Sequence, residues 1–338
     1  MTIPYRTRQI IKRTLQVLLI IALVLAIISC IAFVWLQRYV IYDRNGGIRF
    51  DFSLESVPQG DLIQQPSEPP TIPIDYFTEE DLKGASTELV QMIGYYVDTE
   101  ALSDIAAVRE QLVALPAGTP VLLDVKNIYG DFYYSSKLNS QRPSNIDTKA
   151  MDELIQLLSD RQLYAIARLP ALRDYYYGLH HVPDGLPMPG GYLWADEYYC
   201  YWLDPTSEGT ITYLVQIITE LKSLGFDEVV FNDFHFPDTQ EIVFTQDKQQ
   251  AIATAAQTLV TSCATDTFAV SFTGQDATFP LPAGRSRLYL TGVEASQAVT
   301  IAQQAAVTDP AIHLVFLTDV HDTRFDAYGV LRPLASAH

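Results

Sequence analysis

Charged side chains end two consecutive apolar runs that we expect to be β-strands. Asp124 and Lys126 lie at the end of one run, and Arg168 lies at the end of the next. Alternate residues of a strand point to the same face, so Asp124 and Lys126 share a face. Where parallel strands alternate with helices, side chains at the carboxyl ends of the strands build the active site of a barrel. We therefore expect these three residues to lie around one site.

The fourth apolar run, residues 228–234, ends in a polar cluster whose orientation the pattern leaves open. Asn232 lies on one face of that strand, while Asp233 and His235 lie on the other. Only one face can point into a barrel, unless a bulge shifts the register. Asp319 follows the seventh predicted strand and can join the same cluster.

Two carboxyl groups around a sugar are the minimal apparatus of glycoside hydrolysis, because one acts as an acid and the other as a base or nucleophile. Asp124 and Asp233 are the candidate pair, with Lys126 and Arg168 as electrostatic supports. The alternative is that Asp124, Lys126 and Arg168 form a structural ion-pair network across the barrel mouth, since such networks also perturb pKa values. The sequence leaves both interpretations open.

The connection after the third strand, residues 174–204, is far longer than the usual ~2–6 residues. It contains nine aromatic residues, including Trp194 and Trp202. Flat rings with polar tips suit sugar faces, so these two tryptophans are candidate sugar platforms. The alternative is that most of the rings pack the loop onto the barrel. Asp196 fits either a binding or a structural role, and Asp204 is predicted to be the N-cap of the next helix.

Strand and helix patterns alternate through the chain. Apolar runs predict strands at residues 90–97, 121–126, 163–168, 228–234, 268–272, 287–290 and 312–317. Helical spacing predicts helices at residues 102–115, 148–158, 205–224, 246–261 and 294–306. No Gly-rich phosphate turn follows the first strand, which argues against a dinucleotide-binding fold. The predicted fold is α/β, a (β/α) TIM-like barrel in which seven strands are visible, so that it can be short of one strand.

The first residues predict a membrane anchor. Residues 17–36 carry no charge, and such a run can cross a hydrocarbon core of ~30 Å. The charged residues that precede it are all basic, so residues 1–16 are predicted to be a cytoplasmic tail. A cleaved signal peptide is the alternative, but no small-x-small site follows the run. Residues 37–80 are a predicted Pro-rich stalk and residues 81–338 the barrel domain. The expected location is the cell membrane, single-pass, with the barrel outside the cytoplasm.

Charge and cysteine content limit the partners. The chain has 22 Lys+Arg and 40 Asp+Glu, and its first 38 residues hold 5 bases and no acid, so the remainder carries about −23. Such a surface repels phosphate, and no nucleic-acid partner is expected. No cofactor or metal site is expected either, because the His180-His181 pair has no third ligand spaced from it. Cys200 and Cys263 can form a disulfide only if they meet, which the sequence does not decide.

Leu122-Leu123-Asp124-Val125-Lys126 is an apolar strand that ends in Asp-Val-Lys. Five further segments follow it: Ala165-Ile166-Ala167-Arg168, Trp194-Ala195-Asp196, Trp202-Leu203-Asp204-Pro205, and, on either side of the fourth strand, Leu224-Gly225-Phe226-Asp227-Glu228 and Phe236-Pro237. With these segments the chain, over roughly residues 90–240, resembles a glycosyl-hydrolase-like TIM-barrel family of bacterial membrane-anchored envelope proteins, long a domain of unknown function, in which the first of these strands reads Val-Ile-Asp-Val-Lys.

The resemblance implies a carbohydrate site at the strand ends, with one departure. The family has Phe-Asp-Tyr-x-Arg-Phe-Pro where this chain has Phe231-Asn232-Asp233-Phe234-His235-Phe236-Pro237. The family's expected catalytic aspartate therefore falls on Asn232 and its arginine on His235. The sequence predicts a membrane-anchored, glycoside-hydrolase-like protein that acts on an envelope or other polysaccharide. The alternative is an inactive carbohydrate-binding or scaffold module on the same barrel.

Overall fold

The computed structural model describes residues 40–42, 48–50, 88–138, 146–274 and 276–334 of the chain. The chain forms two compact units, residues 1–76 and 77–338. In the first, β1 (Val40–Tyr42) pairs antiparallel with β2 (Ile48–Phe50). This hairpin falls within the predicted stalk. The Pro-rich stretch of the stalk, the predicted anchor at 17–36 and the predicted tail at 1–16 lie outside the described residues.

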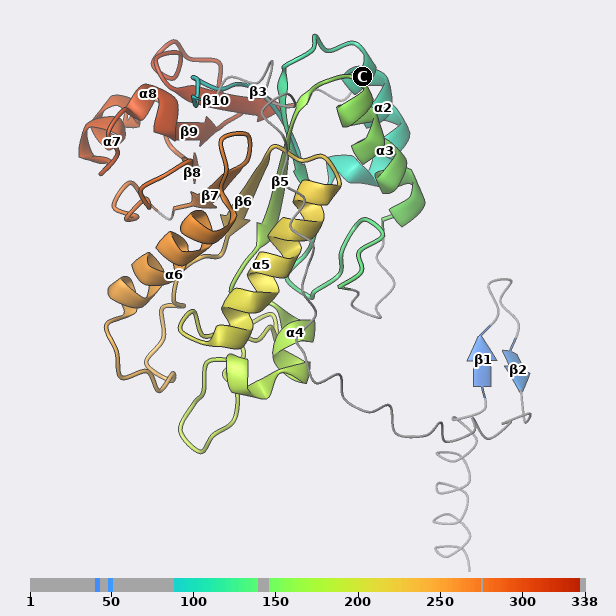
Figure 1. The fold of residues 1–338 in the computed structure, drawn as a ribbon, viewed down its shortest axis with the longest axis vertical. Coiled ribbons are helices and arrows are strands. Elements are labelled where there is room, and N and C mark those ends of the chain that lie inside the picture. The colour runs from blue at the N-terminus through green and yellow to red at the C-terminus, as the bar shows by residue number, and fades with distance from the viewer. Residues whose placement is uncertain (1–39, 43–47, 51–87, 139–145, 275, 335–338) are drawn as a thin grey trace, which may run out of the picture. The chain divides into compact units, whose positions relative to one another are not determined.

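The second unit is a closed barrel of eight parallel strands (Figure 1). The strands follow one another around the barrel in chain order, and the last pairs with both its predecessor and the first. They are β3 (Ile93–Val97), β4 (Pro120–Asp124), β5 (Tyr164–Pro170), β6 (Glu228–Asn232), β7 (Ala269–Thr273), β8 (Leu288–Thr291), β9 (Leu314–Leu317) and β10 (Gly329–Pro333).

Helices surround most of the barrel (Figure 1). They are α2 (Ile105–Val113), α3 (Thr148–Asp160), α4 (Tyr175–His180), α5 (Glu208–Ser223), α6 (Lys248–Cys263), α7 (Ala298–Gln304) and α8 (Pro310–His313), with 3-10 turns at η2 (Ala101–Asp104) and η3 (Val182–Asp184). Among the described residues, no helix combines the length and apolar character needed to cross a bilayer.

The predicted barrel is confirmed, and it is not short of a strand. The pattern missed β10 because only Val330 and Leu331 form its apolar run, between Gly329 and Pro333. No amphipathic helix pattern lies between β9 and β10 to indicate a following strand. The pairing of β10 with β3 closes the sheet, and this long-range contact has no local signature in the sequence.

The start of α5 differs from the prediction. The N-cap is Ser207, whose hydroxyl accepts a hydrogen bond from the Gly209 amide. Asp204 instead closes a turn just before the helix, accepting from the amide and the hydroxyl of Thr206. The predicted end is confirmed, since Gly225 follows the helix with a φ of 90° that favours glycine.

Strand alternation divides the apolar side chains into an inner and an outer core. Leu122, Ile166 and Val230 are fully buried in the inner core within the barrel. Their neighbours Leu123 and Phe231 belong to the outer core under the helices. Because successive strand residues point to opposite faces, each strand contributes side chains to both the inner and the outer core.

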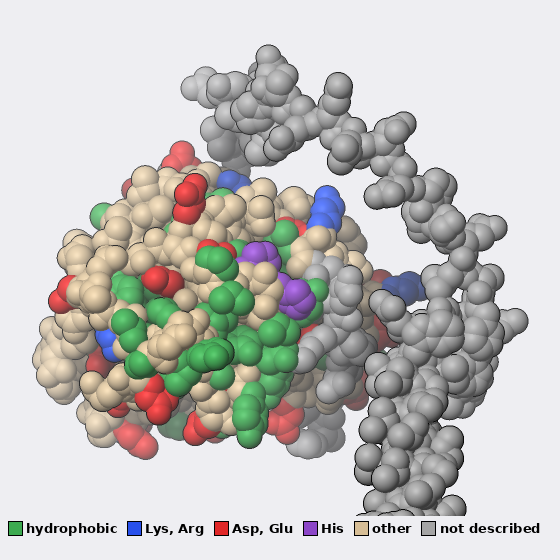
Figure 2. Space-filling view, turned by 90° about the horizontal axis from the view of Figure 1, so that it is seen from below, with side chains coloured by type: hydrophobic (Ala, Val, Ile, Leu, Met, Phe, Trp, Pro, Cys, Tyr) green, Lys and Arg blue, Asp and Glu red, His purple; other side chains and the backbone are tan. Residues whose placement is uncertain are grey.

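The segment between β5 and α5 covers the end of the barrel at which α4 lies. Figure 2 looks onto this end. Hydrophobic side chains, drawn in green together with tyrosine, gather across it. Three tyrosines of the segment are strongly exposed, Tyr192 at 76%, Tyr198 at 53% and Tyr199 at 80%.

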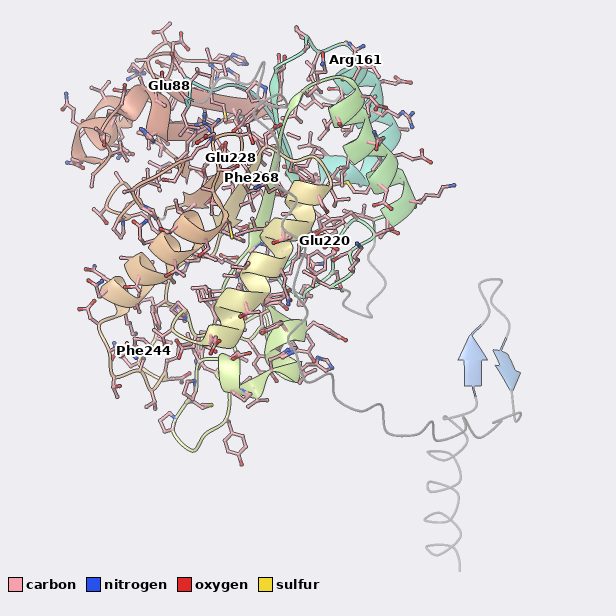
Figure 3. All side chains as sticks on the ribbon, in the orientation of Figure 1. Glu88, Arg161, Glu220, Glu228, Phe244 and Phe268 are labelled. Atoms are coloured by element: carbon pink, nitrogen blue, oxygen red, sulfur yellow. The ribbon has the colours of Figure 1, made fainter. Side chains whose placement is uncertain are left out.

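The opposite end of the barrel is filled by a buried charge. Glu228 begins β6 and is fully buried, and Figure 3 labels it far from Phe244 at the α4 end. One carboxylate oxygen accepts from the hydroxyls of Ser271 and Tyr289. The other accepts from Tyr164 and from Arg287 at 2.5 Å. Each oxygen is satisfied, so the charge is stable where it lies.

We predict that Glu228→Ala destabilises the barrel strongly. The substitution leaves Arg287 buried without its carboxylate, which costs about 3–5 kcal/mol of unfolding free energy. Glu153→Ala is the matched control, because Glu153 pairs with Arg109 at an exposed position and its loss costs at most about 1 kcal/mol. Chemical denaturation measures both values, and equal losses for the two variants would contradict this account.

Candidate active site at the carboxyl ends of the strands

A cavity of about 500 Å³ opens where the barrel strands end, within the range of ~300–1,000 Å³ usual for ligand pockets. Strands β4 to β8 each contribute a lining residue at or just after their carboxyl ends. Six of the residues singled out from the sequence line this cavity: Asp124, Lys126, Arg168, Asn232, Asp233 and His235. The structure thus brings these six together, as strand order in a closed barrel requires.

Both Asn232 and Asp233 reach the cavity, because the strand geometry breaks between them. Asn232 has the inward parity of Val230 and ends β6. Asp233 then adopts a left-handed φ of 51°. Phe231 and Phe234, three residues apart, consequently both pack into the outer core. The orientation that the sequence left open is resolved by this break, and strained backbone of this kind concentrates at functional sites.

Asp124 is held by four hydrogen bonds. Arg168 donates from Nε at 2.6 Å and from a terminal nitrogen at 3.0 Å, one bond to each carboxylate oxygen. Thr99 adds its amide at 3.0 Å and its hydroxyl at 3.2 Å. Bidentate, charge-assisted bonds fix the position of a carboxylate. Asp124 is therefore held in one orientation at the cavity wall, and Arg168 has little freedom to move.

Asp233 has the opposite electrostatic character. Burial raises its pKa above the ordinary carboxyl range, although the positive charges of Arg173, His235 and Lys126 oppose that rise. The Asn232 side-chain amide donates to its Oδ2 at 3.2 Å. Two carboxyl groups whose surroundings differ in this way can hold different protonation states at one pH, which is how acid and base roles are divided.

Lys126 lines the cavity, but its ammonium group is buried in a pair with Asp174 at 2.7 Å, and both side chains are fully buried. Asp174 also accepts from the Tyr213 hydroxyl and from the Tyr177 amide, which caps α4. The pair fixes the start of the long aromatic segment to the barrel. Lys126 thus acts on the cavity through its charge and through the loop that it anchors.

Trp202 and Asp196 form the wall behind His235. The Trp202 indole donates to Asp196 at 3.0 Å, and Arg173 pairs with the same carboxylate at 2.5 Å. Trp202 is only 5% exposed, with its ring 5.1 Å from the His235 ring. The packing alternative therefore describes Trp202, which has no open face for a sugar.

Trp194 and Asp319 lie away from the cavity lining. The Trp194 indole donates to Glu241 at 2.8 Å, which joins the aromatic segment to the loop after β6. Asp319 is exposed beyond β9. The pKa of Tyr96 is raised by burial, by the charge of Asp98 and, to a smaller extent, by the charge of Asp319. Neither residue touches the site that the other six form.

Several lining residues carried no signal in the sequence analysis. Thr273 and Thr291 end β7 and β8, so an inspection of every strand's last residue would have found them. Thr99 and Tyr133 lie in loops, and their hydroxyls are 3.2 Å apart next to Asp124. Nothing in the spacing of loop residues could have placed these two.

Neither thiol takes part in the site. Cys200 and Cys263 are buried and unpaired, so the disulfide that the sequence left open does not form. Burial raises the pKa of Cys200 to about 11, and a protonated thiol is a poor nucleophile. Within the described ranges, no cluster of His, Cys, Asp and Glu could hold a metal ion.

We predict that Asp233→Asn stabilises the protein at neutral pH. When the pKa of a carboxyl group is higher in the folded than in the unfolded protein, the protein loses stability as pH rises above the unfolded pKa of ~3.9. The advantage of the variant should therefore be small below that pH and grow above it. Asparagine also tolerates the left-handed backbone, so the change isolates the charge.

Denaturation curves near pH 3.5 and pH 7 measure this difference for wild type and variant. The matched control is Asp238→Asn, an exposed carboxyl on the same loop, which should change little at either pH. An advantage of Asp233→Asn that shrinks as pH rises would show that the cavity favours the charged carboxylate.

Comparison with known proteins places the fold among glycoside hydrolase barrels. An inactive mutant of the GH20 exo-β-N-acetylglucosaminidase from Vibrio harveyi is 9% identical, with a TM-score of 0.50 over 72% of this chain and 50% of that one. An α-galactosidase from Thermus thermophilus is 11% identical, with a TM-score of 0.49 over 72% and 58%. This chain spans only about half of these enzymes' length, and at such identity the likeness concerns the fold alone.

A hypothetical protein from Ruminiclostridium thermocellum is 19% identical, with a TM-score of 0.45 over 53% of this chain and 96% of that one. No curated protein matches the chain significantly. A family model described as "Putative glycosyl hydrolase domain" (DUF4015) matches residues 96–269, just over half of the chain. The matched region contains both candidate carboxyl groups and the three strands β4 to β6, and the chain belongs to this glycosyl hydrolase domain family.

Proposed function

We propose that this protein is a membrane-anchored, extracytoplasmic glycoside hydrolase that acts on a polysaccharide of the cell envelope. The observation that carries the proposal is the left-handed backbone at Asp233. It delivers a second carboxyl group to the cavity although Asn232 occupies the inward strand position. Family membership and the barrel fold support the same reading of the site.

The two carboxyl groups suit different steps of glycosidic bond cleavage. Asp233, with its raised pKa, is the general acid that protonates the leaving oxygen. Asp124, fixed by Arg168 and Thr99, is the anion that faces the developing oxocarbenium charge. Arg168 keeps that carboxylate oriented, so that it needs no reorganisation when the bond breaks.

The exposed tyrosines of the aromatic segment replace the predicted tryptophan platforms. Tyr198 lies under the Arg173 guanidinium at 4.9 Å, which holds the ring in place. Tyr199 has a left-handed φ of 59° and is 80% exposed, so a strained turn presents its ring to solvent. Aromatic faces held outward in this way suit the apolar faces of sugar rings.

Glycan binding without turnover is the second candidate. The observation that favours it is the saturation of Asp124, because a carboxylate whose oxygens already accept four hydrogen bonds has few lone pairs left for a reacting sugar. Under this reading Arg168 and Asp124 are a structural pair, and the cavity only holds a sugar.

Loss of the acid should slow turnover strongly. We predict that Asp233→Asn lowers kcat/KM by about 10²–10⁴-fold and leaves glycan binding intact. Measurement uses soluble oligosaccharides, with N-acetylglucosaminides and α-galactosides first because of the enzymes that share the fold. Trp194→Phe is the control, because it preserves an aromatic ring outside the cavity and should keep most activity. Binding by wild type with no turnover on any substrate would favour the second candidate.

Asn232→Asp tests the neighbouring position. A new carboxylate beside Asp233 removes the amide donor and adds a like charge, so it should raise the pKa of the acid further. We predict that the basic limb of the pH–rate profile moves to higher pH in this variant. An unchanged profile would show that the Asp233 carboxyl is not the group that limits the rate.

The proposed location rests on the uncharged run at 17–36 and its basic flank. Protease added to intact spheroplasts should remove the barrel domain and leave a short membrane-bound fragment. Full protection of the domain, together with digestion after lysis, would place the barrel on the cytoplasmic side.

A further inference from the structure

A second cavity, of about 950 Å³, adjoins the candidate active site. It shares His235 and Thr273 with the first cavity, so the two meet at the end of β7 and the loop after β6. Either cavity alone has the size of a whole ligand site, at ~300–1,000 Å³. Side by side they exceed what a single sugar needs.

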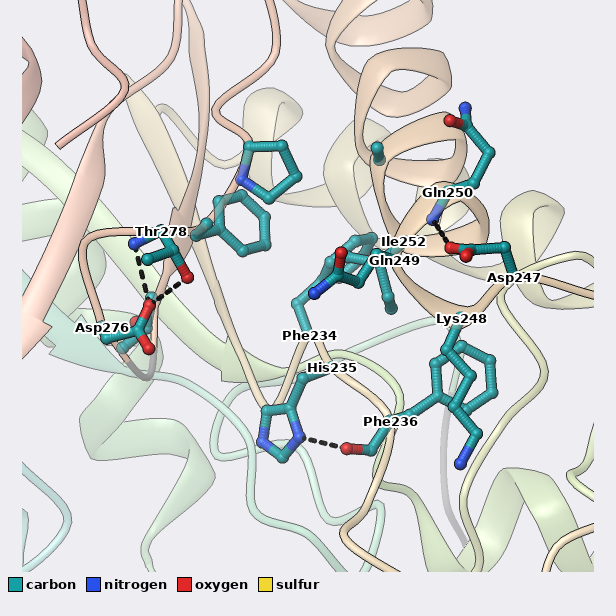
Figure 4. Close-up of a pocket in the computed structure, with 14 residues that line it drawn as sticks. Phe234, His235, Phe236, Asp247, Lys248, Gln249, Gln250, Ile252, Asp276 and Thr278 are labelled. Carbon is teal, nitrogen blue, oxygen red and sulfur yellow. Dashed lines mark hydrogen bonds between the residues drawn. The ribbon is translucent and has the colours of Figure 1, made fainter.

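The walls of the second cavity come from the loop after β6, the segment after β7 and the start of α6 (Figure 4). Asp276 and Thr278 lie on one side, after β7, while Asp247, Lys248 and Gln250 lie on the other, at the start of α6. Further walls are the rings of Phe234, Phe236 and Phe279. Rings beside polar groups that can donate or accept hydrogen bonds are the composition suited to carbohydrate.

The charges in this cavity disfavour an anionic ligand. The amino end of α6 would attract an anion, but the Asp247 carboxylate already occupies it and accepts from the Gln250 amide. Asp276 accepts from the amide and hydroxyl of Thr278, and these bonds lower its pKa. Lys248 is the one Lys or Arg among the lining residues, and its ammonium lies 5.5 Å from the Phe236 ring. Two carboxylates face this one ammonium, so acidic side chains outnumber Lys and Arg in this cavity.

We propose that the two cavities form one binding groove for a chain of several uncharged sugars, with His235 and Thr273 at the junction. This inference rests on the proposed function and names its substrate class, an uncharged oligosaccharide or polysaccharide chain. Sugars that occupy the second cavity bind next to the residues that cut or hold the chain in the first. Affinity therefore rises with chain length until both cavities are filled.

Gln249→Trp tests the groove by filling the second cavity. Gln249 is an exposed residue of α6 that projects into the middle of the cavity (Figure 4). Ser262→Trp is the matched control, an exposed position of the same helix outside the lining. Calorimetry uses the full chain in detergent, in the Asp233→Asn background so that no chain is cut. The probes are uncharged ladders of N-acetylglucosamine and of galactose, from disaccharide to hexasaccharide, and a galacturonic acid ladder as the anionic comparison.

On at least one uncharged ladder, the hexasaccharide should bind about tenfold or more tighter than the disaccharide, a difference of about 1.4 kcal/mol. Gln249→Trp should abolish that gain and leave disaccharide binding unchanged, while Ser262→Trp keeps the gain.

Disaccharide binding without a length gain, or a gain that survives Gln249→Trp, would overturn the groove and leave the proposed function standing. Tighter binding of the galacturonic acid ladder would overturn the uncharged class. If sugars of no length bind, both the groove and the proposed function fail.

Discussion

The pairing of β10 with β3 closes the barrel and thereby sets the direction of every strand side chain. Once eight parallel strands close, every second residue must point inward, and the interior has to be filled in layers. Along β6 the inward positions are Glu228, Val230 and Asn232. One strand therefore carries a buried charge at one end, an apolar plug in the middle and a polar group at the mouth.

The charged groups of the barrel differ in how completely they are enclosed, and this separates structure from function. The Glu228–Arg287 pair is buried and saturated by hydroxyl groups, which suits a permanent role in holding the strands. Asp124 and Arg168 are also paired, but their side chains remain 15% and 19% exposed at the cavity. A saturated pair far from solvent can only support the fold, whereas a paired carboxylate at an open mouth can also face a ligand.

Asp233 is the exception to this pattern of paired charges. Its backbone is left-handed, and its carboxyl is disfavoured in the charged form by burial. Proteins retain strain and unfavourable burial where function requires them. The loop that holds Asp233 also places His235 at the junction of the two cavities. The same few residues thus supply the candidate acid and connect it to the space for a longer chain.

Local sequence patterns predict the barrel class and seven of its eight strands, because buried strands and amphipathic helices have strong local periodicity. They also predict that Asp124, Arg168 and Asn232 gather at one end, since parallel strands share their carboxyl edge. The eighth strand was not predicted, because Val330 and Leu331 form an apolar run too short to be recognised without its partner strand β3.

The roles of these side chains depend on contacts that form only in the folded barrel. The left-handed turn at Asp233 has no sequence signature, because aspartate adopts right-handed and extended backbone conformations as well. Trp202 is buried, Lys126 pairs with Asp174, and Thr99 lies beside Asp124. The two pairings join residues that are distant in sequence, and the burial of Trp202 depends on what packs over it. Residue type states what chemistry is available, and the packing of the barrel decides which groups are left free to perform it.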